Sequence, residues 1–158
     1  MEVGYLFQIG DHVVYPMHGA GIIKAIEEKE IAGERKQYFV IKMSINNMDV
    51  MIPADKISST NIRPVTDLTA LKQIIHIFQH GESEQLLPWK ERYKMNADKM
   101  KTGHIQEGAE VVRDLMRIKK EKALNPSEKK MLDDAREFLN SELGLIEGIT
   151  ENHIKSFS

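Results

Sequence analysis

The chain has 158 residues, of which 41% are hydrophobic and 29% are charged, and its net charge is −2. This composition predicts a folded protein and excludes a mainly disordered one. The small net charge argues against a DNA-binding protein that relies on its overall field. The sequence has no cysteine, which excludes disulfides and thiolate metal sites, and it shows no signal-peptide pattern and no long apolar run. We therefore expect a cytoplasmic protein.

The first part of the chain is predicted to form short β-strands. Runs rich in Val, Ile, Tyr and Phe cover residues 11–16, 21–31, 36–43 and 49–53, and a fifth strand is expected near Lys56 to Ile62. Turn residues separate these runs, and Gly33 is free to take a positive φ between the second and third. Short strands with tight connections predict a small antiparallel β-barrel, a kind of module that generally binds partners.

Beyond this barrel the apolar spacing becomes helical. Thr66 or Asp67 can cap a first helix that ends at Gly81, and a linker follows at residues 81–88. The fold class expected is mixed α+β, with a β-barrel at residues 1–64 and an all-α domain at residues 65–158.

The helical region has further start and stop signals. A second helix is expected from Trp89 to Thr102, a third from Ile105 to Lys122, a fourth from Asn125 to Leu143 and a short last one between Ile146 and Phe157. For the fourth, Asn125 is the expected N-cap, Pro126 fits the first helical position, and Glu128 can bond back to the cap.

Positive charge is concentrated between Trp89 and Lys122. This stretch holds ten lysines and arginines against six acids, a local net charge of +4, so the remainder of the chain carries −6. On the third helix, the spacing of Arg113, Arg117 and Lys120 predicts a basic stripe. A local basic face on an acidic body suits a protein that touches nucleic acid after a partner has brought it there.

Trp89 is the only tryptophan and stands at the edge of this basic stretch. Two alternatives follow from the residues alone. Large aromatic side chains are highly buried on average, so Trp89 can start a helix and fill a core. Alternatively, Trp89 is an exposed wedge between cations that bind phosphates, namely Lys90, Arg92 and Lys94.

Signals for catalysis are weak. His76 and His80 have the spacing that places two imidazoles on one helix face, but the stretch HIFQH lacks the glutamate of a zincin motif. No nucleophile, base and orienting group form a motif, so we expect no catalytic residue, no metal and no cofactor. An enzyme acting on a small molecule would require a deep pocket lined by titratable groups.

Several motifs together resemble the CarD family of bacterial transcription regulators. They are GDHVVYPMHGAGII at residues 10–23, WKERYKMNADKMKTG at 89–103, EVVRDL at 110–115 and SEKKML at 127–132. Their order and spacing match the family from about Phe7 to Leu145. The first part is also similar to the RNA polymerase interaction domain of the transcription-repair coupling factor.

This resemblance implies a division of labour. A Tudor-like N-terminal domain would dock on the β1 lobe of the RNA polymerase β subunit, and the helical domain would meet promoter DNA at the upstream edge of the bubble. Trp89 matches the family's tryptophan that enters the minor groove, and Lys129 matches a position with a backbone contact. With Lys90, Arg92 and Lys94 as further phosphate contacts, the implied function is stabilisation of the open complex without strong sequence specificity.

The candidates for the polymerase contact are two strands: the one around Lys29 and Ile31, and its expected neighbour, which contains Met51. These three residues fall at family positions that face the β lobe. Family members often carry arginine where this chain has Lys29 and Met51. We therefore expect a docking contact that is weaker or more apolar. The alternative from another class is a non-enzymatic adaptor between proteins, with Trp89 as a hot spot for a protein partner.

Overall fold

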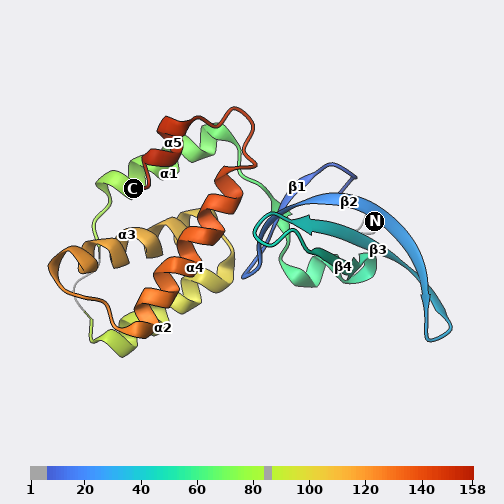
Figure 1. Cartoon of the computed structure of the whole chain (residues 1–158), viewed down its shortest axis with the longest axis horizontal. Helices are drawn as coiled ribbons and strands as arrows, with labels where there is room; N and C mark the ends of the chain where they lie inside the picture. The colour runs from blue at the N-terminus through green and yellow to red at the C-terminus, as the bar shows by residue number, and fades with distance from the viewer. Residues whose placement is uncertain (1–6, 84–86) are drawn as a thin grey trace.

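The computed structural model describes residues 7–83 and 87–158, with a β-sheet at one end of an elongated molecule and helices at the other (Figure 1). The strands are β1 (His12–Tyr15), β2 (Gly19–Ile31), β3 (Glu34–Met43), β4 (Asp49–Pro53) and β5 (Arg63–Pro64). The helices are η2 (Ala54–Thr60), α1 (Leu68–His80), α2 (Trp89–Thr102), α3 (Ile105–Glu121), α4 (Pro126–Leu143) and α5 (Glu151–Lys155). The expected mixed α+β fold is confirmed. The expected linker at 81–88 lies partly outside the described residues.

The sheet is antiparallel and has the strand order β4-β3-β2-β1-β5. Alternate residues of β3, including Phe39 and Ile41, point into a buried apolar cluster. A register shift between Ile23 and Ala25 changes which residues of β2 face this cluster. The turn that joins β2 to β3 has positive φ at Ala32 and Gly33, as expected for a two-residue hairpin loop, so the prediction for Gly33 is confirmed.

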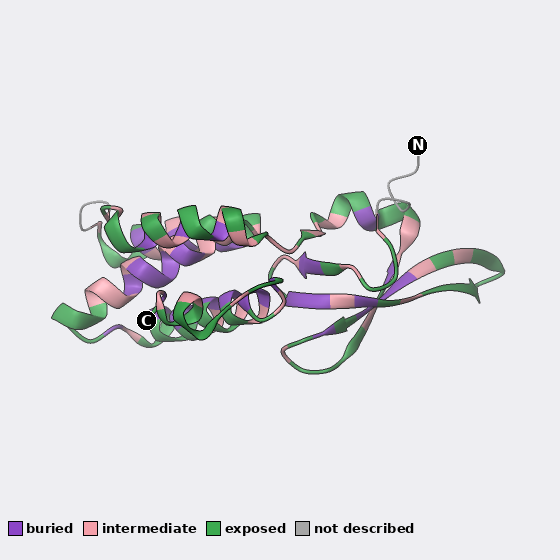
Figure 2. Ribbon diagram, turned by 90° about the horizontal axis from the view of Figure 1, so that it is seen from above, coloured by how far each residue is buried: buried purple, intermediate pink, exposed green. Residues whose placement is uncertain are grey.

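The far part of the β2–β3 pair extends beyond the other strands. β1 pairs with β2 only as far as Ile22, and β4 pairs with β3 only as far as Tyr38. Residues 28–37 therefore form a two-stranded ribbon, which we call the ribbon. Figure 2 shows that most of it is exposed, while the parts of both strands nearer the helices are buried.

The prediction of a strand near Lys56 to Ile62 is wrong. Residues 54–60 form the 3-10 helix η2, and the last strand, β5, begins only at Arg63. Ile57 is the one buried residue of η2, so a single apolar anchor replaces the alternation of a strand. The Ser59 hydroxyl donates to the Lys56 carbonyl at 2.8 Å and the Thr60 hydroxyl to the Ile57 carbonyl at 2.6 Å, which favours local turns over ladder pairing.

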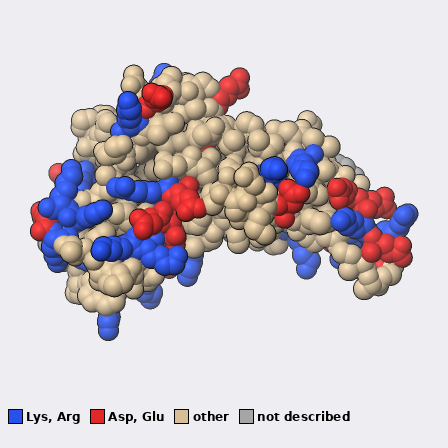
Figure 3. Space-filling model, viewed as in Figure 1, with Lys and Arg blue, Asp and Glu red and all other residues tan. Residues whose placement is uncertain are grey.

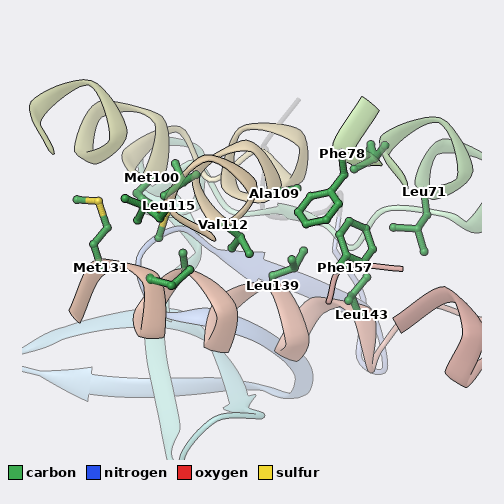
Figure 4. Packing of buried hydrophobic residues seen from close by; sticks show 14 of the residues in the cluster. Leu71, Phe78, Met100, Ala109, Val112, Leu115, Met131, Leu139, Leu143 and Phe157 are labelled. Atoms are coloured by element: carbon green, nitrogen blue, oxygen red, sulfur yellow. The ribbon is translucent and has the colours of Figure 1, made fainter. Parts of the chain in front are cut away.

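The helices enclose a second buried apolar cluster, which is separate from that of the sheet. Figure 4 shows side chains of α1, α3 and α4 meeting there, and Phe78 of α1 faces Phe157 near the C-terminus with ring centroids 5.0 Å apart. Two predicted caps are confirmed: Asp67 accepts from the Ala70 amide at 2.8 Å, and Asn125 accepts from the Glu128 amide at 2.9 Å. These caps fix where α1 and α4 begin.

The last helix is shorter than predicted. α5 covers only Glu151–Lys155, because Gly148 has a positive φ of 83° and the chain turns there. Ile146, which was expected to start the helix, is instead buried in a turn after α4. Thr150 begins α5 through a capping box with His153, a signal that the sequence contains but that we did not predict.

The sheet and the helices meet along a polar seam. Glu142 of α4 accepts two hydrogen bonds from Arg63 of β5, at 2.6 and 2.7 Å, and one from the Thr66 amide at 3.0 Å. Arg63 also donates to the Gly103 carbonyl at 2.8 Å, and Ser141 of α4 accepts from the Ala20 amide at 3.0 Å. Backbone groups and a charged pair together fix the orientation of the sheet relative to the helices.

Candidate functional site

Trp89 is exposed at the first position of α2. It follows Pro88, which has no side-chain cap to offer, and 45% of its surface is accessible. The alternative in which Trp89 fills the core is therefore wrong. An exposed indole that begins a helix is available to a partner, because nearly half of the Trp89 surface is left uncovered by the fold.

Exposed lysines surround this end of the molecule. Lys90 lies next to Trp89, with its ammonium 6.0 Å from the centroid of the indole ring, and Lys94 follows one turn later. On α4, Lys129 is exposed in the first turn. Figure 3 shows lysine and arginine side chains gathered over the helical end. The first turns of α2 and α4 are in contact, so the positive ends of two helix dipoles add to this charge.

The expectation that Arg92 is an exposed cation beside Trp89 is wrong. Only 8% of Arg92 is accessible, and its guanidinium donates to both carboxylate oxygens of Glu128 at 2.7 Å. A third hydrogen bond joins it to the Leu87 carbonyl at 3.3 Å. The hydrogen bonds to Glu128 raise the pKa of Arg92. The guanidinium is thus occupied inside the protein and is not presented to a phosphate.

Glu128 also differs from the prediction. Its carboxylate does not bond back to the backbone of Asn125 but accepts from the Asn125 side-chain amide at 3.0 Å. The remaining capacity of the carboxylate is used by Arg92. Arg92 shares the buried face of α2 with Asn96 and Met100, but two of these three residues are polar, so no apolar pattern in the sequence indicated the pairing.

The predicted basic stripe on α3 is only partly exposed. Arg113 is buried and donates to Asp114, to the Ile77 carbonyl and to the Glu82 carbonyl, so it fastens the end of α1 to α3. Lys120 is exposed. Arg113 therefore belongs to the internal structure and not to a surface that binds phosphates.

The three candidate docking residues lie on one face of the sheet. In the register, Met51 is opposite Val40, which is opposite Ala25, and the side chains of alternate residues share a face. Counting every second residue of β2 from Ala25, Lys29 is the second and Ile31 the third, so both lie on the same face as Ala25. Lys29, Ile31 and Met51 are all exposed. We call this surface the docking face. The strand with Met51 is not the neighbour of β2, however, because β3 lies between them.

The docking face is bordered by two free strand edges. β4 is the outer strand on one side, and among residues 7–83 and 87–158 no strand pairs with the other side of β2 beyond Ile23, which bonds to Gly10 and Asp11. Free main-chain donors and acceptors along these edges can extend a sheet of another protein.

The two histidines with helical spacing lie close together on α1. The rings of His76 and His80 are 4.5 Å apart on α1, and within residues 7–83 and 87–158 no group of three potential ligands is placed to hold a metal ion. None of the helices described is long and apolar enough to cross a membrane.

Comparisons with known proteins find relatives for both parts of the chain. Residues 7–66 match the family model described as the CarD-like/TRCF RID domain, and residues 73–157 match the one described as the CarD C-terminal domain. A Bacillus subtilis (strain 168) protein named "Putative transcription factor YdeB" is 75% identical over 152 residues, which cover 96% of this chain and 99% of that protein.

Proposed function

The chain belongs to the CarD family of transcription regulators, and from that premise we propose that it docks on RNA polymerase and stabilises the promoter open complex. The chain is a CarD-like transcription factor, and its residues 7–66 form a domain of the RNA polymerase-interaction type. In the proposal, two domains divided near residue 64 act together without chemistry of their own.

The observation that carries the proposal is the exposure of Trp89 among exposed lysines. An aromatic wedge at a base step costs a few kcal/mol of unstacking, and this cost is already met where the duplex has opened. Trp89 would therefore prefer the junction of melted and paired promoter DNA at the upstream edge of the bubble. Holding that junction would slow reannealing and lengthen the life of the open complex.

Phosphate contacts in this proposal come from Lys90, Lys94 and Lys129, which are exposed. Neutralising three phosphates gives a slope of roughly −3 for log affinity against log salt, since each contributes about −0.9. Such binding to free DNA is weak at physiological salt. Docking on the polymerase supplies the missing affinity as a high effective concentration. Arg92 is left out of this set because it is buried with Glu128.

The docking face supports the proposed polymerase contact. Lys29, Ile31 and Met51 share this face, and it is bordered by β4 and by the part of β2 beyond Ile23, which have no further strand beside them in the described part of the chain. We propose that it meets the β1 lobe of the β subunit, with main-chain hydrogen bonds supplying affinity and side chains supplying selectivity. Two of its three residues are apolar, which predicts a contact less sensitive to salt than the DNA contact.

The lifetime of a competitor-challenged open complex tests the DNA role. We expect wild-type protein to lengthen this lifetime with its cognate polymerase, and Trp89→Ala to lose most of the effect. Ile154→Ala is the matched control, because Ile154 is another exposed apolar residue but lies on α5. If Trp89→Ala acts like wild type, the wedge is excluded. If Trp89→Ala loses binding to a protein partner while salt-dependent binding to forked DNA is absent in wild type, the adaptor is the correct function.

A second variant pair tests the docking face. Met51→Asp is expected to weaken binding to the isolated β1 lobe, since a charge without a partner is placed in an apolar contact. Met48→Asp is the control, because Met48 is also exposed but lies just before β4, off the docking face. Equal binding by Met51→Asp and Met48→Asp would exclude this face as the polymerase contact.

A further inference from the structure

The start of α2 is held by tertiary contacts in place of a helix cap. Pro88 at the N-cap position provides no side-chain hydrogen bond to the free amides of the first turn. α4, by contrast, has Asn125 as its cap. Trp89 therefore stands on a helix end that local interactions leave free to fray.

Arg92 lies one turn after Trp89 and makes the contacts that the cap does not. Its guanidinium joins the Leu87 carbonyl, which precedes Pro88, to the Glu128 carboxylate in the first turn of α4. Glu128 is itself oriented by the Asn125 amide and is directly followed by Lys129. A continuous set of hydrogen bonds thus links the segment with Trp89 to the segment with Lys129.

We propose that Arg92 is a positioning residue, which with Glu128 holds Trp89 and Lys129 in fixed register for one DNA junction. This inference rests on the proposed function. The two parallel hydrogen bonds between a guanidinium and a carboxylate fix both distance and angle, which a lysine or an apolar contact does not. The positions of the wedge and of the phosphate contact are then set together.

Stability alone does not account for this pair. Removing two charges from water is costly, and replacing a buried ion pair with apolar residues of similar size is often neutral or stabilising. Arg92 is 8% accessible and Glu128 1%, so both have lost most of their hydration. What the pair provides beyond an apolar contact is directionality, at the place where two proposed DNA contacts meet.

Two variants distinguish a positioning role of Arg92 from a direct phosphate contact and from a role in stability alone. Arg92→Lys keeps the positive charge but loses the planar fork, so a direct phosphate contact would largely survive it while positioning would not. The double variant Arg92→Met/Glu128→Leu removes one charge of each sign and leaves the net charge unchanged. We expect it to stay folded with near wild-type stability, measured by urea denaturation, so that any loss of function is not a loss of folding.

Spin-label distances measure the positioning directly. The chain has no cysteine, so labels at Glu91→Cys and Ser127→Cys, both exposed, report the separation of the first turns of α2 and α4. We expect a narrow distance distribution with the native pair and a broadened or shifted one in both variants. Labels at Lys101→Cys and Arg136→Cys serve as the control and are expected to keep their distribution, because they lie away from the pair.

The open-complex lifetime supplies the functional readout. Both variants are expected to lose most of the lifetime increase that depends on Trp89 while binding the polymerase as wild type does. Unchanged label distances, or an unchanged lifetime with Arg92→Lys, would overturn the inference. If Trp89→Ala itself has no effect on the lifetime, the proposed function fails. The label distances then decide by themselves whether the pair holds these helix ends.

Discussion

Two arginine–glutamate pairs hold α4, one near each end, and they differ in what they join. Glu142 pairs with Arg63 across the seam between sheet and helices, and Glu128 pairs with Arg92 of α2 within the helical domain. The geometry is alike, with two hydrogen bonds of 2.6–2.7 Å in each. The two pairs differ in how well their arginines are hydrated: 21% of the Arg63 side chain is accessible, against 10% of the Arg92 side chain.

The helix dipole adds to this difference. Glu128 lies at the positive end of α4 and is stabilised there, whereas Glu142 lies at the negative end. Glu142 therefore depends on Arg63 and on the Thr66 amide for its stabilisation. The Arg63–Glu142 pair therefore sets how the sheet is oriented relative to the helices, while the Arg92–Glu128 pair sets how the first turns of α2 and α4 are aligned.

The largest effect is expected from Glu128→Ala. The substitution leaves Arg92 buried without its partner, which lowers the free energy of unfolding by about 3–5 kcal/mol. Urea denaturation followed by circular dichroism measures this change. A loss below about 1 kcal/mol, the size typical of surface pairs, would show that Arg92 reaches water when Glu128 is removed.

Glu142→Ala is expected to cost less, about 1–3 kcal/mol, because Arg63 is better hydrated and keeps its hydrogen bond to Gly103. Its distinctive effect is on shape. Solution scattering should change for Glu142→Ala, since the seam is loosened, and stay as in wild type for Glu128→Ala under folding conditions. The reverse pattern of scattering would contradict the roles given to the two pairs.

Asn125→Ala tests how much of the Glu128 arrangement is due to the helix cap. Loss of the cap should lower the free energy of unfolding by about 1 kcal/mol. Asn125→Ser keeps a capping oxygen but lacks the amide that donates to Glu128. Near wild-type stability of Asn125→Ser in urea denaturation would assign the loss to capping, and equal losses in both variants would assign it to the amide.

The smallest effect on stability is expected at an exposed ion pair whose N–O distance is about the same as in the two arginine–glutamate pairs. Lys24 and Asp49 are 2.7 Å apart, but their side chains are 51% and 41% accessible. We expect no measurable change in the urea midpoint of Lys24→Ala at pH 7. A drop as large as that of Glu142→Ala would show that distance, and not burial, determines the value of these pairs.

The pH dependence of this exposed pair has a definite sign. The hydrogen bond with Lys24 lowers the pKa of Asp49 below 3.8 and raises the pKa of Lys24 above 10.5. Any stabilisation from Asp49 is present above pH 3.8 and is lost as the pH falls through the lowered pKa. That from Lys24 is present below pH 10.5 and is lost as the pH rises. Since the effect on stability is expected to be too small to measure, the check is an NMR titration of the Asp49 carboxyl, whose pKa should rise in Lys24→Ala.

Much of the fold follows from local signals. The predicted α2 has the bounds observed, because Pro88 and Gly103 interrupt the helix on either side, and Asn125 and Pro126 begin α4 as predicted. The fifth strand was predicted too early in the chain, at Lys56 to Ile62, because the hydroxyls of Ser59 and Thr60 bond to nearby carbonyls, an interaction that apolar alternation does not reveal.

The sequence by itself determined the class of fold, most helix ends, the local excess of positive charge and the family. It did not determine which cations face water. The buried face of α2 carries Arg92 and Asn96, which have no apolar periodicity to mark them, and the partner of Arg92 is 36 residues away. Only the tertiary structure decided that Arg92 is internal while Trp89 is exposed, because burial of a charge depends on a partner that local sequence does not specify.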